Sequence, residues 1–355
     1  MLIVRVYKKG IIGFLAAALL AGVLSTPAYA EEAPSVSAEK AVLMYADGTV
    51  LYEKNARERS LIASTTKLMT ALLVAEHSQL DEELSIPENC CGIEGSSVYL
   101  EPGQRCSVYE LLQGLLLASG NDAALSLAQH TAGSVPTFVA WMNARARAIG
   151  MRNSHFVNPH GLDAANHYST AMDLALLMAK CMGNADLARI LRQTSCQIGD
   201  KLFANHNKLL QLCPGCVGGK TGFTTAAGRC LVSCCERDGA RLICVTLSAP
   251  RDWEDHQKLY DWAYAHYSLR DVTADYHQEM PVISGEKSTV SLSAPSMPLL
   301  LRNGSEVELL PEIPPFVFAP VERGTDAGTL NVRIDNKRQI QVPLSYSETV
   351  ESVKH

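Results

Sequence analysis

Two patterns of apolar residues divide the chain near residue 270. Up to about Tyr267, runs with helical spacing alternate with β-prone runs, and the first of these form a hairpin in which Asp47-Gly48 joins Ala41–Ala46 to Thr49–Glu53. Beyond that point, short β-prone runs are separated by Pro, Gly and Asn, as in a small all-β domain. These runs are Ser288–Leu292, Glu306–Leu310, Pro315–Val321, Thr329–Ile334 and Gln339–Leu344.

The segment before residue 270 predicts several helices between two hairpins. Leu68, Leu72 and Ala75 recur at helical spacing after Ser64. Strands at both ends with helices between them favour an α+β domain, with one antiparallel sheet packed against a helical region. The other expected helices are Val108–Leu117, one beginning at Asp122, Pro136–Ile149, one from Thr170 to Met182, and Glu254–Tyr267, and the second hairpin is Arg229–Cys235 with Arg241–Ser248.

The N-terminus has the pattern of a secretory signal. Basic residues precede the apolar run Ile11–Leu24, and small residues stand at Ala28 and Ala30. The run is shorter than the ~20 residues that a membrane span needs. We therefore expect cleavage after Ala30 and a mature protein that works outside the cytoplasm. The predicted parts are a signal peptide (1–30), an α+β domain (31–270), a small β-rich domain (271–346) and a tail (347–355).

Composition excludes several classes of protein. Of the 355 residues, 47% are hydrophobic and 19% charged, which excludes a disordered chain. The formal net charge is -6, and removal of three basic residues with the signal makes it -9. A mildly acidic protein lacks the basic surface that nucleic acid binding requires.

A serine and a lysine three residues apart are the first candidates for chemistry. A serine hydroxyl is a weak nucleophile until a base takes its proton. Ser64 and Lys67 have the spacing that places two side chains on one helix face. A lysine acts as a base only when it is partly neutral, and burial or a second cation such as Lys220 lowers its pKa. The same spacing also arises by chance in surface helices.

Two further motifs follow in order along the chain. Ser119-Gly120-Asn121 comes directly after an apolar helix and offers a hydroxyl for proton transfer and an amide that can hold a peptide bond, although these residues are also ordinary turn formers. Lys220-Thr221-Gly222 precedes the second hairpin, so we expect it on an edge strand. There the backbone would pair with an extended substrate, and Lys220 and Thr221 would hold its carboxylate.

With these motifs, the sequence resembles the low-molecular-mass penicillin-binding proteins, the serine-type D-alanyl-D-alanine carboxypeptidases of peptidase family S11. The similarity extends to Ile62–Thr70, Phe156–Leu162, His167–Asp173 and Gly219–Gly228, and it is strong over about Val42–Tyr267. It implies a β-lactamase/transpeptidase-like domain followed by a small all-β domain. It also implies removal of the terminal D-alanine from peptidoglycan stem pentapeptides ending in D-Ala-D-Ala, and acylation by β-lactam antibiotics.

The resemblance also implies a role for each motif residue. Ser64 is the acylated nucleophile, Lys67 its general base, and Ser119 relays a proton to the departing D-alanine. No metal or organic cofactor is implied. The substrate-binding residues are Asn121 for the substrate amide, Lys220 and Thr221 for the terminal carboxylate, Gly222 for close approach of the strand, and Phe223, whose backbone N–H forms the oxyanion hole with that of Ser64.

The cysteines depart from the family pattern. Cys213-Pro214-Gly215-Cys216 lies just before Lys220, and Cys230, Cys234 and Cys235 lie just after it. A metal site or a redox clip is one interpretation. We favour the simpler one, small buried apolar side chains with or without one disulfide. We expect His160 and His167 to be structural.

Two other functions fit parts of the sequence. A class A β-lactamase would need a Glu-x-x-x-Asn type segment between the second and third motifs, where this chain has Asn158–Leu162. A catalytically silent wall-binding protein would not need the intact Ser64 and Lys67. The C-terminal segment Ser345–His355 has few apolar residues and two acids, so we expect no strong membrane anchor once the signal is cleaved. A retained signal could still serve as a tether.

Overall fold

The computed structural model describes residues 33–354, and its first sheet has five antiparallel strands in the order β2-β1-β9-β8-β7. The Asp47-Gly48 turn joins β1 to β2 as predicted, and Gly48 has a φ of 101° that suits glycine there. The motif Lys220-Thr221-Gly222 lies on the edge strand, also as predicted. The strands are β1 (Lys40–Tyr45), β2 (Val50–Lys54), β7 (Cys216–Thr224), β8 (Gly228–Arg237) and β9 (Ala240–Leu247).

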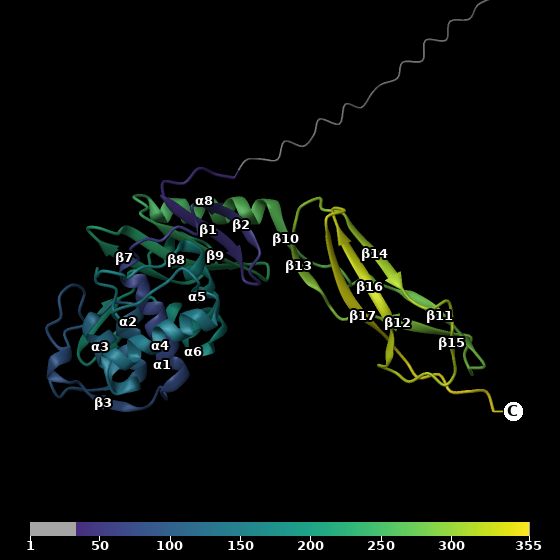
Figure 1. The fold of residues 1–355 in the computed structure, drawn as a ribbon, viewed down its shortest axis with the longest axis horizontal. Helices are drawn as coiled ribbons and strands as arrows, with labels where there is room; N and C mark the ends of the chain where they lie inside the picture. The colour runs from purple at the N-terminus through teal and green to yellow at the C-terminus, as the bar shows by residue number, and fades with distance from the viewer. Residues whose placement is uncertain (1–32, 355) are drawn as a thin grey trace, which may run out of the picture. The chain divides into compact units, whose positions relative to one another are not determined.

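Both faces of this sheet are covered by helices. Alternate residues of a strand point to opposite faces. Val42 and Met44 of β1 therefore pack in one apolar core with the helices that follow Ser64, whereas Ala41 and Leu43 pack in a second core with α8 (Asp252–His266). Figure 1 shows α8 on one face of the sheet and the helices between Lys67 and Leu191 on the opposite face.

Side-chain caps fix where several helices begin. Ser107 and Glu110 form a reciprocal capping box at the start of α2. At the start of α5, Thr170 accepts a hydrogen bond from the Asp173 amide, but the Asp173 carboxylate bonds to the amide of Asn153, so no reciprocal box forms there. The helices on the face opposite α8 are α1 (Lys67–His77), α2 (Val108–Leu116), α3 (Asn121–Ala132), α4 (Val135–Ala148), α5 (Ala171–Gly183) and α6 (Ala185–Leu191). A single helical turn, α7 (Leu209–Leu212), precedes β7.

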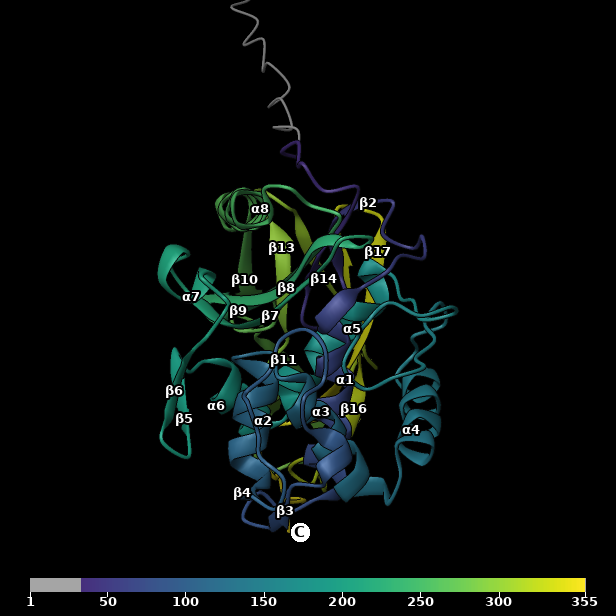
Figure 2. The same cartoon turned by 90° about the vertical axis from the view of Figure 1, so that its left-hand side faces the viewer.

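Two short ribbons and a 3-10 turn, η2 (Glu88–Cys90), connect these elements. The ribbon of β3 (Glu83–Ser85) and β4 (Arg105–Ser107) leads into α2. The ribbon of β5 (Ser195–Ile198) and β6 (Lys201–Ala204) packs against α2 and continues toward the third motif (Figure 2). These pieces are too short to give a periodic sequence signal, and the sequence did not predict them.

The C-terminal residues form sheets without helices, which confirms the predicted all-β region. After α8, β10 (Tyr267–Asp271) pairs with β13 (Pro298–Arg302). A six-stranded sheet follows, in the order β14-β16-β17-β12-β11-β15, around a separate apolar core. Its strands are β11 (Gln278–Ile283), β12 (Thr289–Ser293), β14 (Val307–Glu312), β15 (Val317–Phe318), β16 (Asp326–Ile334) and β17 (Arg338–Tyr346).

Proline explains where the strand predictions failed. β11 contains Pro281 and β13 begins at Pro298, so neither run was expected to be a strand. The opposite error concerns Pro315–Val321, of which only Val317 and Phe318 form a strand, while Val321 makes an isolated bridge to Val350. Proline lacks the N–H that a ladder requires, which limits that strand to two residues.

The structure describes part of the predicted tail and none of the predicted leader. The predicted leader lies outside the described residues. Val350 pairs with Val321 and is buried in the β-rich region, so part of the predicted tail packs there. The boundaries after residues 270 and 346 stay predictions. Within residues 33–354, the structure has no helix that combines the length and the apolarity needed to span a bilayer.

Candidate active site

Ser64 lies in the 3-10 turn η1 (Ala63–Thr66), one turn ahead of the expected α-helix. In a 3-10 helix the side chains at i and i+3 almost eclipse each other. Lys67, the first residue of α1, is therefore directed at the serine, and its Nζ donates a hydrogen bond to Ser64 Oγ at 2.9 Å. The predicted proximity of Ser64 and Lys67 is confirmed, by a tighter helix than expected.

Lys67 is held in a buried position by three acceptors. Besides Ser64 Oγ, its Nζ donates to Asn121 Oδ1 at 2.6 Å and to the carbonyl oxygen of His160 at 2.8 Å. Burial, and after it the charge of Lys220, hold the pKa of Lys67 well below its ordinary value, while Asp122 raises it. Both predicted causes of a lowered pKa are confirmed, and the neutral amine is the form that can accept a proton.

A second hydroxyl–ammonium pair joins the second and third motifs. Ser119, with a φ of 63°, lies in the turn between α2 and α3, and its Oγ accepts a hydrogen bond from Lys220 Nζ at 3.0 Å. The Lys220 ammonium also donates to the carbonyl oxygen of Thr221. Burial lowers the pKa of Lys220 to about 7. The pair can therefore gain or lose a proton near neutral pH.

Asn121, the first residue of α3, makes two hydrogen bonds through its side chain. Its Oδ1 accepts from Lys67 and its Nδ2 donates to the carbonyl oxygen of Glu94 at 2.6 Å. The side chain is buried. In this arrangement Asn121 orients Lys67, and its contact with a substrate amide stays a prediction.

The edge strand β7 passes very close to the serine turn. A Cβ placed on Gly222 would lie 3.0 Å from both the Ser64 nitrogen and the Ile62 carbonyl oxygen. Both contacts would be tighter than ordinary Cβ contacts, so glycine suits this close approach. The next residue, Phe223, has a 67% exposed side chain, so nothing in its packing requires an aromatic ring. The oxyanion role of the Ser64 and Phe223 backbone N–H groups stays a prediction.

The sequence singled out Phe156–Leu162 and His167–Asp173 but did not indicate that they support the serine turn. Ala63 has a φ of 45°, and Gly161, with a φ of 90°, lies against its carbonyl. His160 contributes its backbone oxygen to Lys67, and His167 Nε2 lies 2.8 Å from Thr66 Oγ1, with its ring buried. Both histidines thus have structural positions, as expected. The sequence signal that could have indicated this close packing is Gly161, directly after His160.

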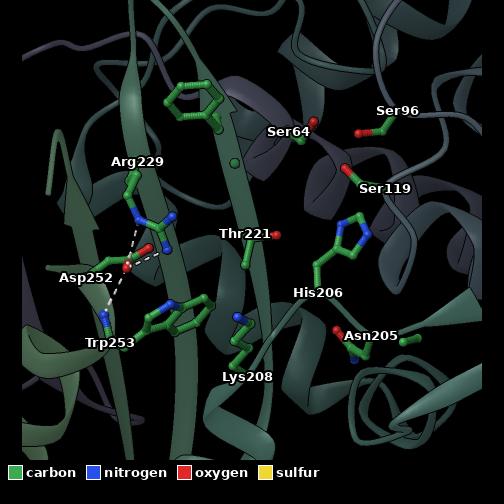
Figure 3. A pocket seen from close by; sticks show the side chains of 13 residues that line it. Ser64, Ser96, Ser119, Asn205, His206, Lys208, Thr221, Arg229, Asp252 and Trp253 are labelled. Atoms are coloured by element: carbon green, nitrogen blue, oxygen red, sulfur yellow. Dashed lines mark hydrogen bonds and ion pairs between the residues drawn. The ribbon is translucent and has the colours of Figure 1, made fainter. Parts of the chain in front are cut away.

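A cleft of about 570 Å³ opens beside Ser64, Ser119 and Thr221 (Figure 3). Figure 3 shows Ser64, Ser96 and Ser119 on one side of strand β7, and Arg229, Asp252 and Trp253 on the other side. The complete lining is Ser64, Ser96, Ser119, Ala204, Asn205, His206, Lys208, Thr221, Gly222, Phe223, Arg229, Asp252 and Trp253.

Arg229 is a partly exposed cation in this cleft that the sequence did not identify. Its Nε and Nη2 both donate to Asp252 Oδ1, at 3.0 and 2.8 Å, and its guanidinium lies over the Trp253 ring. Thr221 pairs with Leu231 in the ladder, and Arg229 lies two residues from Leu231 on β8. Residues two apart share a face, so Thr221 and Arg229 are diagonal neighbours on one side of the sheet.

The described residues form no disulfide and offer no metal site. Residues 33–354 contain no group of three or more His, Cys, Asp or Glu side chains arranged to hold a metal ion. All eleven cysteines are unpaired, and nine of them are buried. Their burial agrees with the interpretation that we favoured for them.

Comparisons with known proteins agree on one family. The family model described as D-alanyl-D-alanine carboxypeptidase matches residues 27–251. The chain is 30% identical over 335 residues to D-alanyl-D-alanine carboxypeptidase DacF of Bacillus subtilis, covering 88% of this chain and 85% of that protein. It is 34% identical over 345 residues to DacC of Escherichia coli, covering 90% and 86%.

Solved structures show the same relationship. Penicillin-binding protein 5 of Haemophilus influenzae aligns with a TM-score of 0.73 and 29% identity, over 90% of this chain and 99% of that chain. The D-alanyl-D-alanine carboxypeptidase DacD of Francisella tularensis aligns with a TM-score of 0.71 and 26% identity, over 91% and 95%. The similarity therefore includes the β-rich C-terminal region.

Proposed function

Because the chain belongs to the D-alanyl-D-alanine carboxypeptidase family, and is thus a serine-type carboxypeptidase, we propose that it removes the terminal D-alanine from peptidoglycan stem pentapeptides through an acyl-enzyme on Ser64. The observation that carries this proposal is the 2.9 Å hydrogen bond from Lys67 Nζ to Ser64 Oγ beside an open cleft. A buried amine with a lowered pKa is suited to take the proton of the serine that it touches.

In the first step, Ser64 Oγ attacks the carbonyl carbon of the penultimate D-alanine while Lys67 accepts the hydroxyl proton. The N–H groups of Ser64 and Phe223 receive the negative charge that develops on the carbonyl oxygen. The C–N bond to the terminal D-alanine then breaks. Ser119 and Lys220, joined at 3.0 Å, deliver the proton that the leaving amine needs.

In the second step, water attacks the ester, the C–O bond to Ser64 breaks, and the serine regains its proton. Penicillins mimic the D-Ala-D-Ala terminus and acylate the same hydroxyl. The chain has no Glu-x-x-x-Asn segment between its second and third motifs to direct a water at that ester. We therefore expect a long-lived drug adduct instead of the rapid turnover of a β-lactamase.

The terminal carboxylate of the substrate docks at Thr221. Lys220, which is buried behind the strand, contributes positive charge only in its protonated form. Arg229 lies on the same face of the sheet as Thr221 and keeps a partly exposed guanidinium. Its planar guanidinium is always charged and suits a carboxylate, so we include Arg229 in the carboxylate site.

Because the proposed substrate is part of the cell wall, we expect this activity on the outer side of the cytoplasmic membrane. The leader predicted at residues 1–30 supplies a route there. Mature protein beginning at Glu31, recovered outside the cytoplasm, is the expected result of cell fractionation and N-terminal sequencing. A membrane-bound form with that N-terminus would overturn this expectation.

Incubation of the purified protein with a stem pentapeptide tests the proposed reaction. Mass spectrometry should show loss of one alanine, with no further shortening and no loss in the Ser64→Ala variant. An unchanged pentapeptide with the wild-type protein, under conditions where it is folded, would support a silent wall-binding protein instead.

A further inference from the structure

A tight turn leads into β7, the edge strand that carries the third motif. Its first and last residues are Cys213 and Cys216. Pro214 and Gly215 occupy its central positions, and the Cys216 amide donates to the Cys213 carbonyl oxygen at 3.0 Å. Gly215 has a φ of 82°, which suits the third position of a proline–glycine turn. The turn fixes Cys213 beside the neighbouring strand β8.

On β8, Cys235 lies against this turn. Its Sγ is 3.4 Å from the Pro214 carbonyl oxygen, and the Cys213 Sγ is 3.8 Å from the same oxygen. Both thiols therefore contact the same carbonyl oxygen, which places the two sulfurs beside each other. A Cβ on Gly215 would lie 3.2 Å from the Cys235 Sγ, so glycine at this position preserves the space that the sulfur occupies.

The two thiols have opposite electrostatic environments. The Arg237 Nη2 donates to Cys213 Sγ at 3.6 Å, and Asp261 pairs with the same guanidinium. The interaction with Cys235, and then Arg237, lower the pKa of Cys213 to about 7 although burial and Asp261 oppose this. The interaction with Cys213, followed by burial, raises the pKa of Cys235. One thiol is therefore a nucleophile and the other is its protonated partner.

We propose that Cys213 and Cys235 form a peroxide-sensitive dithiol that closes to a disulfide. The Cys213 thiolate attacks hydrogen peroxide, forming an S–O bond and breaking the O–O bond, so that the sulfur becomes a sulfenic acid and hydroxide leaves. The Cys235 sulfur then displaces hydroxide from that sulfur, and the protons released convert both hydroxides to water. Two thiols are oxidised by two electrons, and one peroxide is reduced.

The disulfide would tie the turn before β7 to the adjacent strand β8. Lys220 and Thr221 lie a few residues after that turn on β7. Oxidation would thus fasten the N-terminal end of the strand that carries the third motif. Cys216 is less suited to this role, because burial raises its pKa and its thiol bonds instead to the Gly218 carbonyl oxygen.

Peptide mapping of the intact protein after a brief treatment with hydrogen peroxide tests the proposal. The expected product is a peptide pair linked through Cys213 and Cys235, together with a higher thermal midpoint that dithiothreitol reverses. In Cys235→Ser, dimedone should label Cys213 and no internal disulfide should form. Cys244→Ser, a change at another buried cysteine, is the matched control and should keep the Cys213–Cys235 link.

Arg237→Gln provides a test that leaves both thiols in place. Loss of the guanidinium should raise the pKa of Cys213 part of the way toward the ordinary ~8.5 and slow its reaction at pH 7 severalfold, because the thiolate fraction falls while the interaction with Cys235 remains. A disulfide through Cys216 in the wild type, a lower thermal midpoint after oxidation, or labelling of Cys213 no faster than of Cys244 would overturn the proposal.

Discussion

Gly161 lies so close to Ala63 that a Cβ on the glycine would be 2.0 Å from the Ala63 carbonyl oxygen. The same carbonyl accepts a hydrogen bond from Thr66 Oγ1 at 2.9 Å. Ala63 directly precedes the serine and has a φ of 45°. The loop that contains Gly161 therefore packs directly against the backbone of Ala63, which sets the direction of Ser64.

Gly161→Ala should therefore impair both folding and acylation. The clash with backbone atoms and the positive φ of 90° together should cost more than about 2 kcal/mol of unfolding free energy, measured by urea titration. Gly133→Ala is the matched control, because Gly133 has a φ of 75° but open space around it. It should cost only about 1 kcal/mol and leave penicillin labelling unchanged. Equal losses in the two variants would mean that the contact with Ala63 is unimportant.

Lys220 should make the stability depend on pH. Its pKa is about 7 in the folded protein and 10.5 ordinarily, so between these values the unfolded chain binds more protons. Stability then rises with pH, by up to about 1.4 kcal/mol per unit from this group. Urea unfolding at pH 7 and 9 should show a smaller rise for Lys220→Gln than for the wild type. Lys208→Gln changes an exposed lysine of the same cleft and should keep the wild-type slope.

Acylation by penicillin should need both Ser64 and Lys67. Intact-mass analysis should show one drug molecule per wild-type chain, persisting for hours, and none in Ser64→Ala. Lys67→Ala removes the proton acceptor and should reduce the acylation rate by at least ~10²-fold. Circular dichroism would verify that each variant is folded. Near-normal labelling of a folded Lys67→Ala would assign the base to another residue, and rapid release of hydrolysed drug would indicate a β-lactamase.

Arg229 should contribute to the preference of the enzyme for peptides with a free terminal carboxylate. Arg229→Gln should lower kcat/KM for a peptide ending in D-Ala-D-Ala by ~10- to 100-fold. This range corresponds to the loss of one hydrogen bond to a charged group, which contributes about 1.5–3 kcal/mol. The corresponding peptide amide, which lacks the charge, is the control substrate, and its turnover should change little. Thr221→Val should also affect the acid more than the amide. An equal loss on both peptides would show that Arg229 only supports the fold around Asp252.

The sequence predicted those parts of the molecule that short segments determine. Asp47-Gly48 specifies a turn by itself, and the spacing of Ser64 and Lys67 brings them together in a single helical turn. Ser119 and Lys220 were singled out by their own short motifs, and the resemblance then supplied their roles. They lie 101 positions apart and touch only in the folded protein.

The missed features depend on contacts between distant segments. No local pattern indicates that Gly161 must fit beneath Ala63, or that Arg229 on one strand is held by Asp252 at the start of a helix. The strand β11 was missed because Pro281 is tolerated at a position where its missing N–H costs no ladder bond, which depends on its neighbours in the sheet.

The position of β1 in the sheet has a consequence for how the protein folds. β1 pairs with β9, so Lys40 is the ladder partner of Leu247, at the opposite end of the domain's sequence. Such long-range pairing slows folding, because a large loop must close before any of its contacts are gained. A chain emerging N-terminus first carries Ser64 and Lys67 long before β9 arrives to complete the sheet around them. The nascent protein therefore remains without activity, and one edge of β1 stays unpaired, until β9 has been made at about two thirds of the chain. In this interval the chain is most open to aggregation and to chaperones.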